Sequence, residues 1–165
     1  MLTLTNLVTA TGTLLTGLIA GLMFSFSVAI IPGLTRLPDA SYLQAFQHIN
    51  VSILNPVFLL SFMAPLILLP LATWLQYKQG GNAWLWMLSA ALIYIIAVFG
   101  VTVGGNVPLN EALVKTDLSA ASPDALPAIR AAFEPSWNKL HTIRTVANII
   151  ASAFSIYACI LTLKK

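Results

Sequence analysis

The sequence contains very little charge. Asp, Glu, Lys and Arg together make up 8% of its 165 residues, whereas the hydrophobic fraction is 58%. Soluble domains have about 25% charged residues, so this chain lacks the polar side chains that a water-exposed surface requires. The composition indicates a protein that is solvated by lipid.

Cysteine and clustered basic residues are also scarce. The single cysteine, Cys159, leaves no role for a disulfide and is expected to be a small buried residue. The formal net charge is +3, but Lys and Arg are scattered rather than gathered in a stripe, which argues against nucleic acid as a partner. No Lys or Arg precedes the first apolar run, so we expect this run to remain as a helix rather than to be a cleaved signal peptide.

Four long runs are free of charged residues: 1–35, 49–77, 79–110 and 145–163. A membrane helix needs about 20 mostly apolar residues. The runs are continuous rather than alternating in polarity, which favours helices over barrel strands. The sequence therefore predicts an all-α fold, a bundle of four transmembrane helices in one domain over residues 1–165, with short amphipathic helices in the first and third connections.

Proline, glycine and asparagine mark the predicted ends of the helices. Proline lacks the N–H that a helix interior needs, glycine permits turns, and asparagine caps helix starts. The predicted membrane helices are 6–31, ended by Pro32-Gly33; 56–75, capped by Asn55 and bent at Pro65 and Pro70; 84–103; and 135–163, started by Pro135.

The connections carry their own signals. Asp39 is the predicted N-cap of the amphipathic helix in the first connection, and Asn106 caps the one in the third. Gly80-Gly81-Asn82 predicts a tight turn, so the second and third membrane helices should be antiparallel neighbours. Aromatic residues favour the headgroup level, which places this turn at a membrane surface. The aromatic residues that flank it are Trp74, Tyr77, Trp84 and Trp86.

An even number of crossings puts both termini and the second connection on one side. Lys164-Lys165 directly follows the last helix, and every acidic residue lies towards the other side. Lys and Arg occur on both sides, so their preference for the cytoplasmic face does not by itself decide the orientation. Because of Lys164-Lys165 and the placement of the acidic residues, we expect an integral protein of the cell (inner) membrane with both termini in the cytoplasm. Whether the bundle forms a homo-oligomer is left open.

A polar stripe runs along one face of the last helix. Trp137, His141, Arg144 and Asn148 follow at intervals of four, three and four, the spacing of a single helical face. An Arg at the bilayer centre costs about 2.5–3.5 kcal/mol even on the lenient insertion scale. We therefore expect this stripe, extended by Ser152 and Ser155, to face the interior of the bundle.

A second stripe precedes the second membrane helix. Gln44, His48, Ser52 and Asn55 again share one face by spacing, with Gln47 and Asn50 beside it. Both stripes belong to the same side of the membrane, so the only two histidines, His48 and His141, are expected to approach each other. They are candidates for metal or haem ligands, for a general acid or base, or for structural hydrogen bonds.

Arg144 needs a counter-charge near lipid. The acid closest to a helix end is Glu111, just after Asn106-Val107-Pro108-Leu109-Asn110. One hypothesis is that Glu111 pairs with Arg144, and the alternative is an exposed acid on a surface helix.

These segments resemble the anthrone oxygenase family of small four-helix membrane proteins, much of which is labelled only as a domain of unknown function. The resemblance covers nearly the whole chain in the family's order. It is carried by Gly21-Leu22-Met23-Phe24-Ser25-Phe26, Ile31-Pro32-Gly33-Leu34, Gln47-His48-Ile49-Asn50, Asn55-Pro56, Asn106-Val107-Pro108-Leu109-Asn110, and Trp137 with His141, Arg144 and Thr145.

The resemblance implies a membrane oxidoreductase, since the fungal members look like monooxygenases that use dioxygen to turn an anthrone into an anthraquinone. A small apolar phenolic ligand would then enter a pocket near one membrane face. A histidine is the natural base for the acidic ring proton, a neighbouring cation or amide would stabilise the oxyanion, and Trp137 would stack on the ring. The implied catalytic residues are His141, Arg144, His48, Asn106 and Asn110, and the implied substrate-binding residues are Trp137, Asn55, Gln47 and Asn50.

The cofactor and two other functions stay open. His48 and His141 are the candidate ligands if a haem or a metal ion is used, and cofactor-free chemistry is equally compatible. The alternatives are a haem- or metal-binding protein for electron transfer or sensing, and a non-catalytic membrane subunit whose polar stripes only join helices.

Overall fold

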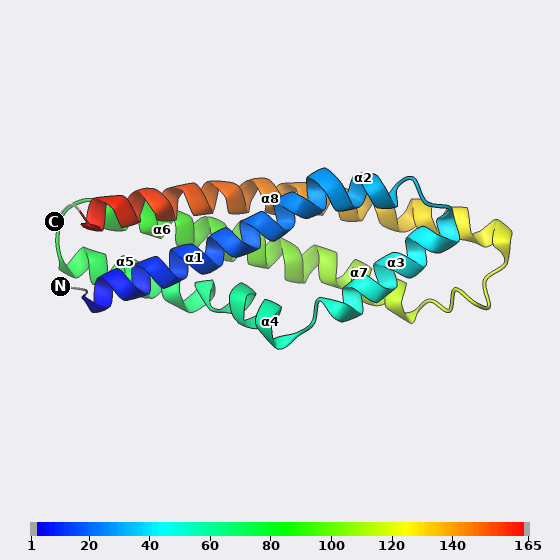
Figure 1. Cartoon of the computed structure of the whole chain (residues 1–165), viewed down its shortest axis with the longest axis horizontal. Helices are drawn as coiled ribbons and strands as arrows, with labels where there is room; N and C mark the ends of the chain where they lie inside the picture. The colour runs from blue at the N-terminus through cyan, green and yellow to red at the C-terminus, as the bar shows by residue number, and fades with distance from the viewer. Residues whose placement is uncertain (1–2, 164–165) are drawn as a thin grey trace.

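The computed structural model describes residues 3–163, whose regular secondary structure is helical. Helical rods lie along one another in an elongated bundle (Figure 1). Within the described residues, four segments are long and apolar enough to cross a membrane: Leu4–Leu34, Pro56–Lys78, Ala83–Lys115 and Pro123–Thr162. The predicted all-α fold with four spanning helices is confirmed.

The first rod is longer than expected. It consists of α1 (Leu4–Ser25), the π-helical turn η1 (Phe26–Ile30) and α2 (Ile31–Leu34). The prediction that Pro32-Gly33 ends it is wrong, because Pro32 falls in the first turn after the π segment. The missing N–H of a proline costs least at such a position.

The first connection holds the expected amphipathic helix, α3 (Asp39–Ser52). Asp39 is not its N-cap, since Pro38 occupies that position and the Asp39 carboxylate binds Arg130 instead. The second rod is broken at Ala64 into α4 (Pro56–Met63) and α5 (Pro65–Lys78). Asn55 caps α4 as predicted, and its Oδ1 accepts the Phe58 N–H at 3.0 Å.

The second and third rods are joined by a tight turn. Gly80 and Gly81 have φ angles of +74° and +80°, values that favour glycine. The third rod runs without a break through α6 (Ala83–Ile93), η2 (Tyr94–Gly100), η3 (Thr102–Asn106) and α7 (Val107–Lys115). Asn106 is therefore inside a helix and is not a cap. Gly105 lies where this rod approaches α8, and a Cβ there would lie 2.8 Å from Leu140 Cδ1, so that the leucine side chain would have to shift.

The fourth rod begins earlier than predicted. A 3-10 turn, η4 (Pro123–Ala125), leads into α8 (Leu126–Leu163), so Pro135 lies inside the helix and does not start it. The rod begins at Ser122-Pro123-Asp124, which the sequence indicates as a turn and helix start. Lys164-Lys165, on which the expected orientation depends, lies outside the described residues.

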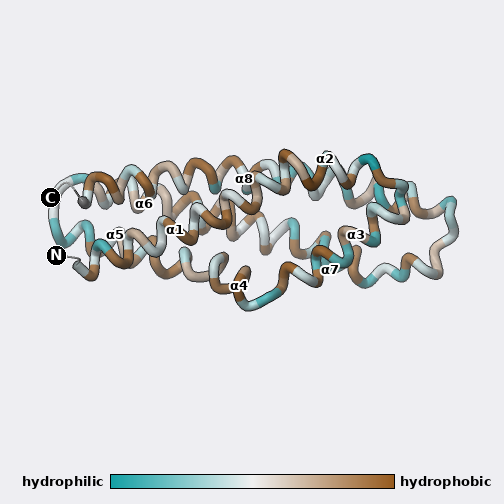
Figure 2. Tube along the Cα trace, in the orientation of Figure 1, coloured by the Kyte–Doolittle hydropathy of each residue, from teal (hydrophilic) through white to brown (hydrophobic). Residues whose placement is uncertain are grey.

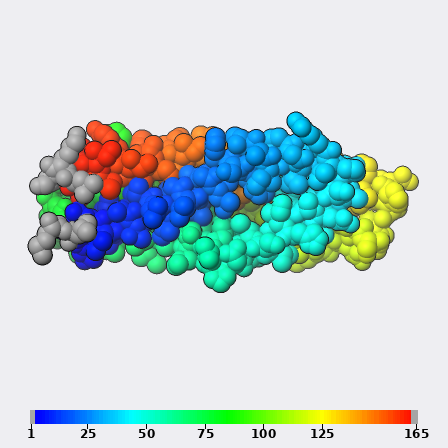
Figure 3. Space-filling model, viewed as in Figure 1, coloured from blue at the N-terminus to red at the C-terminus, as the bar shows by residue number. Residues whose placement is uncertain are grey.

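The bundle has two unlike ends. α1 begins and α8 ends beside the α5–α6 connection, whereas the α2–α3 and α7–α8 connections lie at the opposite end (Figure 1). Apolar residues dominate the shared length of the rods, and polar residues lie at both ends, most extensively on α3, α7 and the connections of that opposite end (Figure 2). On the face shown, α3 lies over this polar end beside α2 (Figure 3).

α3 is held by an aromatic core of its own at the polar end. Tyr42, Leu43 and Phe46 of α3 pack against Leu113 of α7 and against Phe133 and Trp137 of α8, and all six side chains are buried. The Phe46 ring lies edge-on to Trp137, with centroids 5.0 Å apart. This packing places the inward edge of α3 next to the polar stripe of α8.

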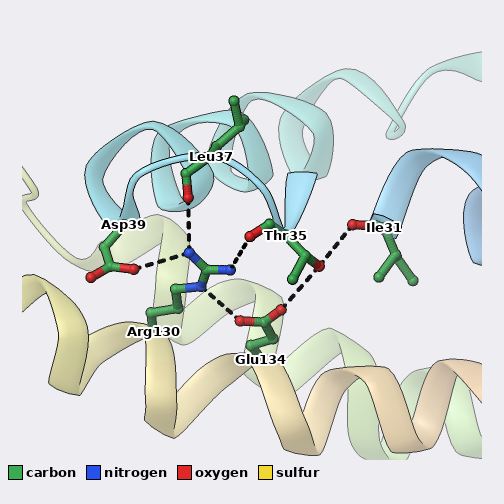
Figure 4. A network of polar contacts seen from close by, with 6 residues as sticks. All are labelled: Ile31, Thr35, Leu37, Asp39, Arg130 and Glu134. Atoms are coloured by element: carbon green, nitrogen blue, oxygen red, sulfur yellow. Dashed lines mark hydrogen bonds and ion pairs between the residues drawn. The ribbon is translucent and has the colours of Figure 1, made fainter. Parts of the chain in front are cut away.

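An ion-pair cluster around Arg130 of α8 also holds α3 in place (Figure 4). The guanidinium donates to Glu134 at 2.7 Å and to Asp39 at 2.9 Å. It also donates to the carbonyl oxygens of Leu37 and Thr35, each at 3.0 Å. One side chain thus ties the chain between α2 and α3 to the start of α8.

The Arg130 guanidinium also lies 4.1 Å above the ring of Tyr42. Burial, and secondarily the nearby Glu134 carboxylate, raise the pKa of the Tyr42 hydroxyl above its usual value. The phenol therefore stays neutral beneath the cation, where its ring provides a cation–π contact.

We expect Arg130→Gln to lower the free energy of unfolding by about 3 kcal/mol, because it leaves the Glu134 carboxylate without its partner in a largely buried position. The Arg130 and Glu134 side chains are only 14% and 18% exposed. Thermal unfolding in detergent measures the loss. Arg36→Gln, an exposed arginine changed in the same way, is the matched control; equal melting temperatures for the two variants would contradict this role.

Candidate functional site

A pocket of about 110 Å³ lies among α1, η1, α3, the end of the third rod and α8, next to the aromatic core. Its walls are mainly apolar, and exposed Leu22 and Leu54 lie among its lining residues, which gives it an apolar mouth. Six of its residues carry polar side-chain atoms: Asn50, Thr102, Asn110, Trp137, His141 and Arg144.

The stripe on α8 faces inward as predicted. Trp137, His141 and Asn148 are buried, as are Ser152 and Ser155. Arg144 is half-buried and lines the pocket. The stripe is therefore turned towards the other helices, and its first three members meet in the pocket.

The contacts of His141 define its tautomer. Nδ1 lies 3.3 Å from Nε and 3.1 Å from Nη2 of Arg144. A guanidinium only donates, so Nδ1 is the acceptor and the proton is on Nε2. Nε2 lies 3.2 Å from the Met23 carbonyl oxygen and donates to it. The ring is thereby neutral and held in one orientation.

Arg144 has no acid beside it. Its guanidinium donates to Thr102 Oγ1 at 3.2 Å and to His141, and none of the ion pairs in the described residues includes it. The hypothesis that Glu111 neutralises Arg144 is wrong, since Glu111 is exposed and pairs with Lys115 one turn away at 3.6 Å. The pocket therefore presents a positive charge that is not neutralised.

Trp137 forms one wall of the pocket. Its ring stacks on the imidazole of His141, with centroids 4.8 Å apart and planes at 13°. The indole N–H donates to Asn110 Oδ1 at 2.7 Å, and Asn106 Nδ2 donates to the Trp137 carbonyl at 3.3 Å. Asn110 lines the pocket and orients Trp137, whereas Asn106 does not line it and joins the third rod to α8.

The residues of the α3 region divide between the pocket and the scaffold. Asn50 is buried and lines the pocket, and its Nδ2 has no partner in the described structure. Gln47 instead donates to the Leu113 and Thr116 carbonyls at the end of α7, both at 2.8 Å. Asn55 caps α4, and its Nδ2 donates to the Ser52 carbonyl. Neither Gln47 nor Asn55 lines the pocket.

The predicted second stripe does not face inward. Gln44, His48, Ser52 and Asn55 are exposed, because α3 buries the opposite, aromatic face against α7 and α8. His48 does not line the pocket that contains His141. The two histidines therefore do not share this pocket.

A metal ion or haem does not fit the residues present. Nε2 of His141 donates to the Met23 carbonyl, and Nδ1 lies against the Arg144 guanidinium, whose positive charge repels a metal cation. A metal needs a free lone pair and is disfavoured beside a guanidinium. The described residues also contain no group of three or more His, Cys, Asp and Glu side chains suited to a metal. The N–H donors of the site are instead suited to an anionic or carbonyl oxygen.

Met23 and Thr102 also contribute to the site, although no role in it was predicted for them. The Met23 carbonyl orients His141, and the Thr102 hydroxyl, which itself donates to Val98 O at 2.7 Å, accepts from Arg144. Met23 lies within a motif that carries the family resemblance, but backbone groups leave no sequence signal. Thr102 is one hydroxyl among many on apolar helices.

One of the comparisons with known proteins identifies a family. Residues 46–154 match the family described as Anthrone oxygenase. No curated protein and no solved structure matches the chain. The match covers about two thirds of the chain, from α3 to the last third of α8, and includes every polar side chain of the pocket. This chain belongs to the anthrone oxygenase family.

Proposed function

We propose that this protein is a membrane-embedded oxidoreductase that uses dioxygen to oxidise a small apolar phenolic substrate of the anthrone type. The four apolar rods cross the cell (inner) membrane, with the termini in the cytoplasm and the pocket near the opposite face. Leu22 and Leu54 at the mouth, which are 38% and 66% exposed, admit the substrate from the lipid.

The observation that carries this proposal is the Arg144 guanidinium in the pocket without a carboxylate partner. A cation inside an apolar bundle costs free energy, and such a residue is by default a candidate for function. Its natural complement is a ligand oxygen that carries or develops negative charge. Asn50, whose amide N–H groups lack a partner, offers further donors in the same cavity.

The lining suits an aromatic ring. Trp137 and Phe26 supply ring faces and edges, since Phe26 lies 5.9 Å from Trp137 and 5.7 Å from His141 by centroids. A cavity of about this size holds roughly one aromatic ring. We infer that the oxygen-bearing ring enters the pocket and that the remainder of a larger substrate extends through the apolar mouth.

His141 acts as the base once substrate is bound. The substrate oxygen competes with Nδ1 for the N–H groups of Arg144, which releases the Nδ1 lone pair to take a proton from the ring methylene. The Met23 carbonyl, which accepts from Nε2, stabilises the imidazolium that forms. The negative charge left on the substrate rests on the oxygen beside Arg144.

Dioxygen is the oxidant in the overall reaction. The substrate anion gives up two electrons to dioxygen at the methylene carbon, and a C–O bond forms there. Loss of water then leaves a ketone. One oxygen atom of dioxygen is incorporated and the other leaves as water with the two hydrogens of the methylene group, so that an anthrone and dioxygen give an anthraquinone and water.

The purified full-length protein in neutral detergent tests this function with a hydroxyanthrone as substrate. An oxygen electrode and the quinone absorbance are followed together, and spontaneous oxidation without protein gives the baseline. We expect one dioxygen consumed for each quinone formed, at a rate proportional to protein. A folded protein that leaves the baseline rate unchanged would overturn the proposal for this substrate class and would favour a non-catalytic membrane subunit.

A further inference from the structure

A second and larger cavity, of about 430 Å³, lies between α5 and α6 at the end of the bundle opposite the candidate site. It is an apolar groove whose walls include Pro70, Trp74 and Tyr77 of α5 and Trp84, Leu88 and Leu92 of α6. Trp74, Tyr77 and Leu92 are largely exposed. Pro70 lies inside α5, where the ring replaces a backbone N–H and shapes the wall of the groove.

The dimensions of the groove match one leaflet. It extends along the third rod from Trp84 to Ile95, about 16 Å at the rise of a helix. Half of the hydrocarbon core of a bilayer is about 15 Å. Trp74, Tyr77 and Trp84 lie at its outer end, as expected for aromatic residues at the headgroup level. A lipid acyl chain therefore fits its length.

Lys78 lies beside the outer end of the groove. Lys78 Nζ lies 5.9 Å from the centroid of the Trp74 ring, and Lys78 forms no ion pair within residues 3–163. All five acidic residues of the sequence, Asp39, Glu111, Asp117, Asp124 and Glu134, belong to the other end of the bundle. Lys78 is therefore available to an anionic group from outside these residues.

We propose that the α5–α6 groove binds one anionic phospholipid, with an acyl chain in the groove and the phosphate beside Lys78. The indole N–H groups of Trp74 and Trp84 donate to the ester and phosphate oxygens at the same level. A lysine near the membrane surface favours anionic lipid by about fivefold. The inference depends on the membrane placement proposed above and is independent of the oxygenase activity.

Native mass spectrometry of the full-length protein, titrated with phosphatidylglycerol or phosphatidylcholine of identical acyl chains, tests the proposal. We expect the first phosphatidylglycerol to bind about fivefold more tightly than the first phosphatidylcholine. Lys78→Gln should remove this preference. Lys139→Gln, an exposed lysine at the other end, should keep it.

Leu92→Trp tests the acyl-chain part of the site separately. Leu92 is 48% exposed, so the larger side chain fills the groove without entering the core. We expect weaker binding of both lipids, whatever their headgroup. Three results would overturn the proposal: an unchanged preference in Lys78→Gln, no effect of Leu92→Trp, or a dimer without retained lipid, which would assign the groove to a second copy of the chain.

Discussion

Replacing His141 by Gln should lower kcat for hydroxyanthrone oxidation by about 10²–10⁴-fold with little change in KM, because the variant loses only the base. The Gln amide can still donate to the Met23 carbonyl and accept from Arg144, the two contacts that hold the imidazole. It cannot take a proton. Steady-state oxygen uptake measures both constants.

His48→Gln is the matched control, since it removes the only other histidine by the same substitution. His48 is exposed and outside the pocket, so we expect wild-type kcat and KM. If both variants lost activity equally, a paired-histidine site would be required and the assignment of His141 as the lone base would be wrong. Full activity in His141→Gln would exclude proton removal by this residue.

Arg144→Gln should lower kcat by about 10²–10³-fold, because the guanidinium is the principal donor to the oxygen on which negative charge develops. The same change should leave the melting temperature unchanged or raise it, since it removes a cation that has no carboxylate partner among the described residues and whose burial costs free energy. A loss of activity without a loss of stability is therefore expected. Oxygen uptake and thermal unfolding of the same preparation measure them.

Two further variants sharpen this prediction. Arg144→Lys keeps the charge but loses the planar fork that contacts Thr102 and His141 together, so its activity should lie between those of wild type and Arg144→Gln. Arg36→Gln removes an exposed arginine and should behave as wild type. A parallel loss of folding and activity in Arg144→Gln would assign Arg144 to the scaffold instead of the reaction.

Most of the fold could be predicted because a lipid environment permits few kinds of backbone structure. The long uncharged runs had to be helices, and the turn at Gly80 and Gly81 was readable from residues that tolerate positive φ. Helix ends were less predictable. Pro32, Asn106 and Pro135 signal boundaries in an isolated helix, but here each lies within a rod, where π-helical turns and neighbouring helices accommodate them.

The spacing of polar residues predicted the correct inward face for α8 and the wrong inward face for α3. On α8, the polar residues that follow His141 lie in the apolar, membrane-length part of the bundle. Polar side chains there would meet lipid if they faced outward, so they face inward. α3 is short and lies at the polar end, so its polar edge can meet water or headgroups while its aromatic edge packs against Trp137. The packing of α3 therefore leaves His48 exposed and places Asn50 in the pocket. The spacing of polar residues along the helix does not predict this outcome.

Four membrane-length helices, and an inward edge shared by Trp137, His141 and Arg144, could be predicted from the printed residues, because apolar run length and helical spacing are local properties. Which groups meet that edge depends on the packing of the folded chain. This packing brought Asn50 and Thr102 to the pocket, left His48 outside, paired Glu111 with Lys115, and turned the Met23 carbonyl towards His141. Contacts between distant segments depend on how whole helices pack, and one residue's identity does not encode its partner.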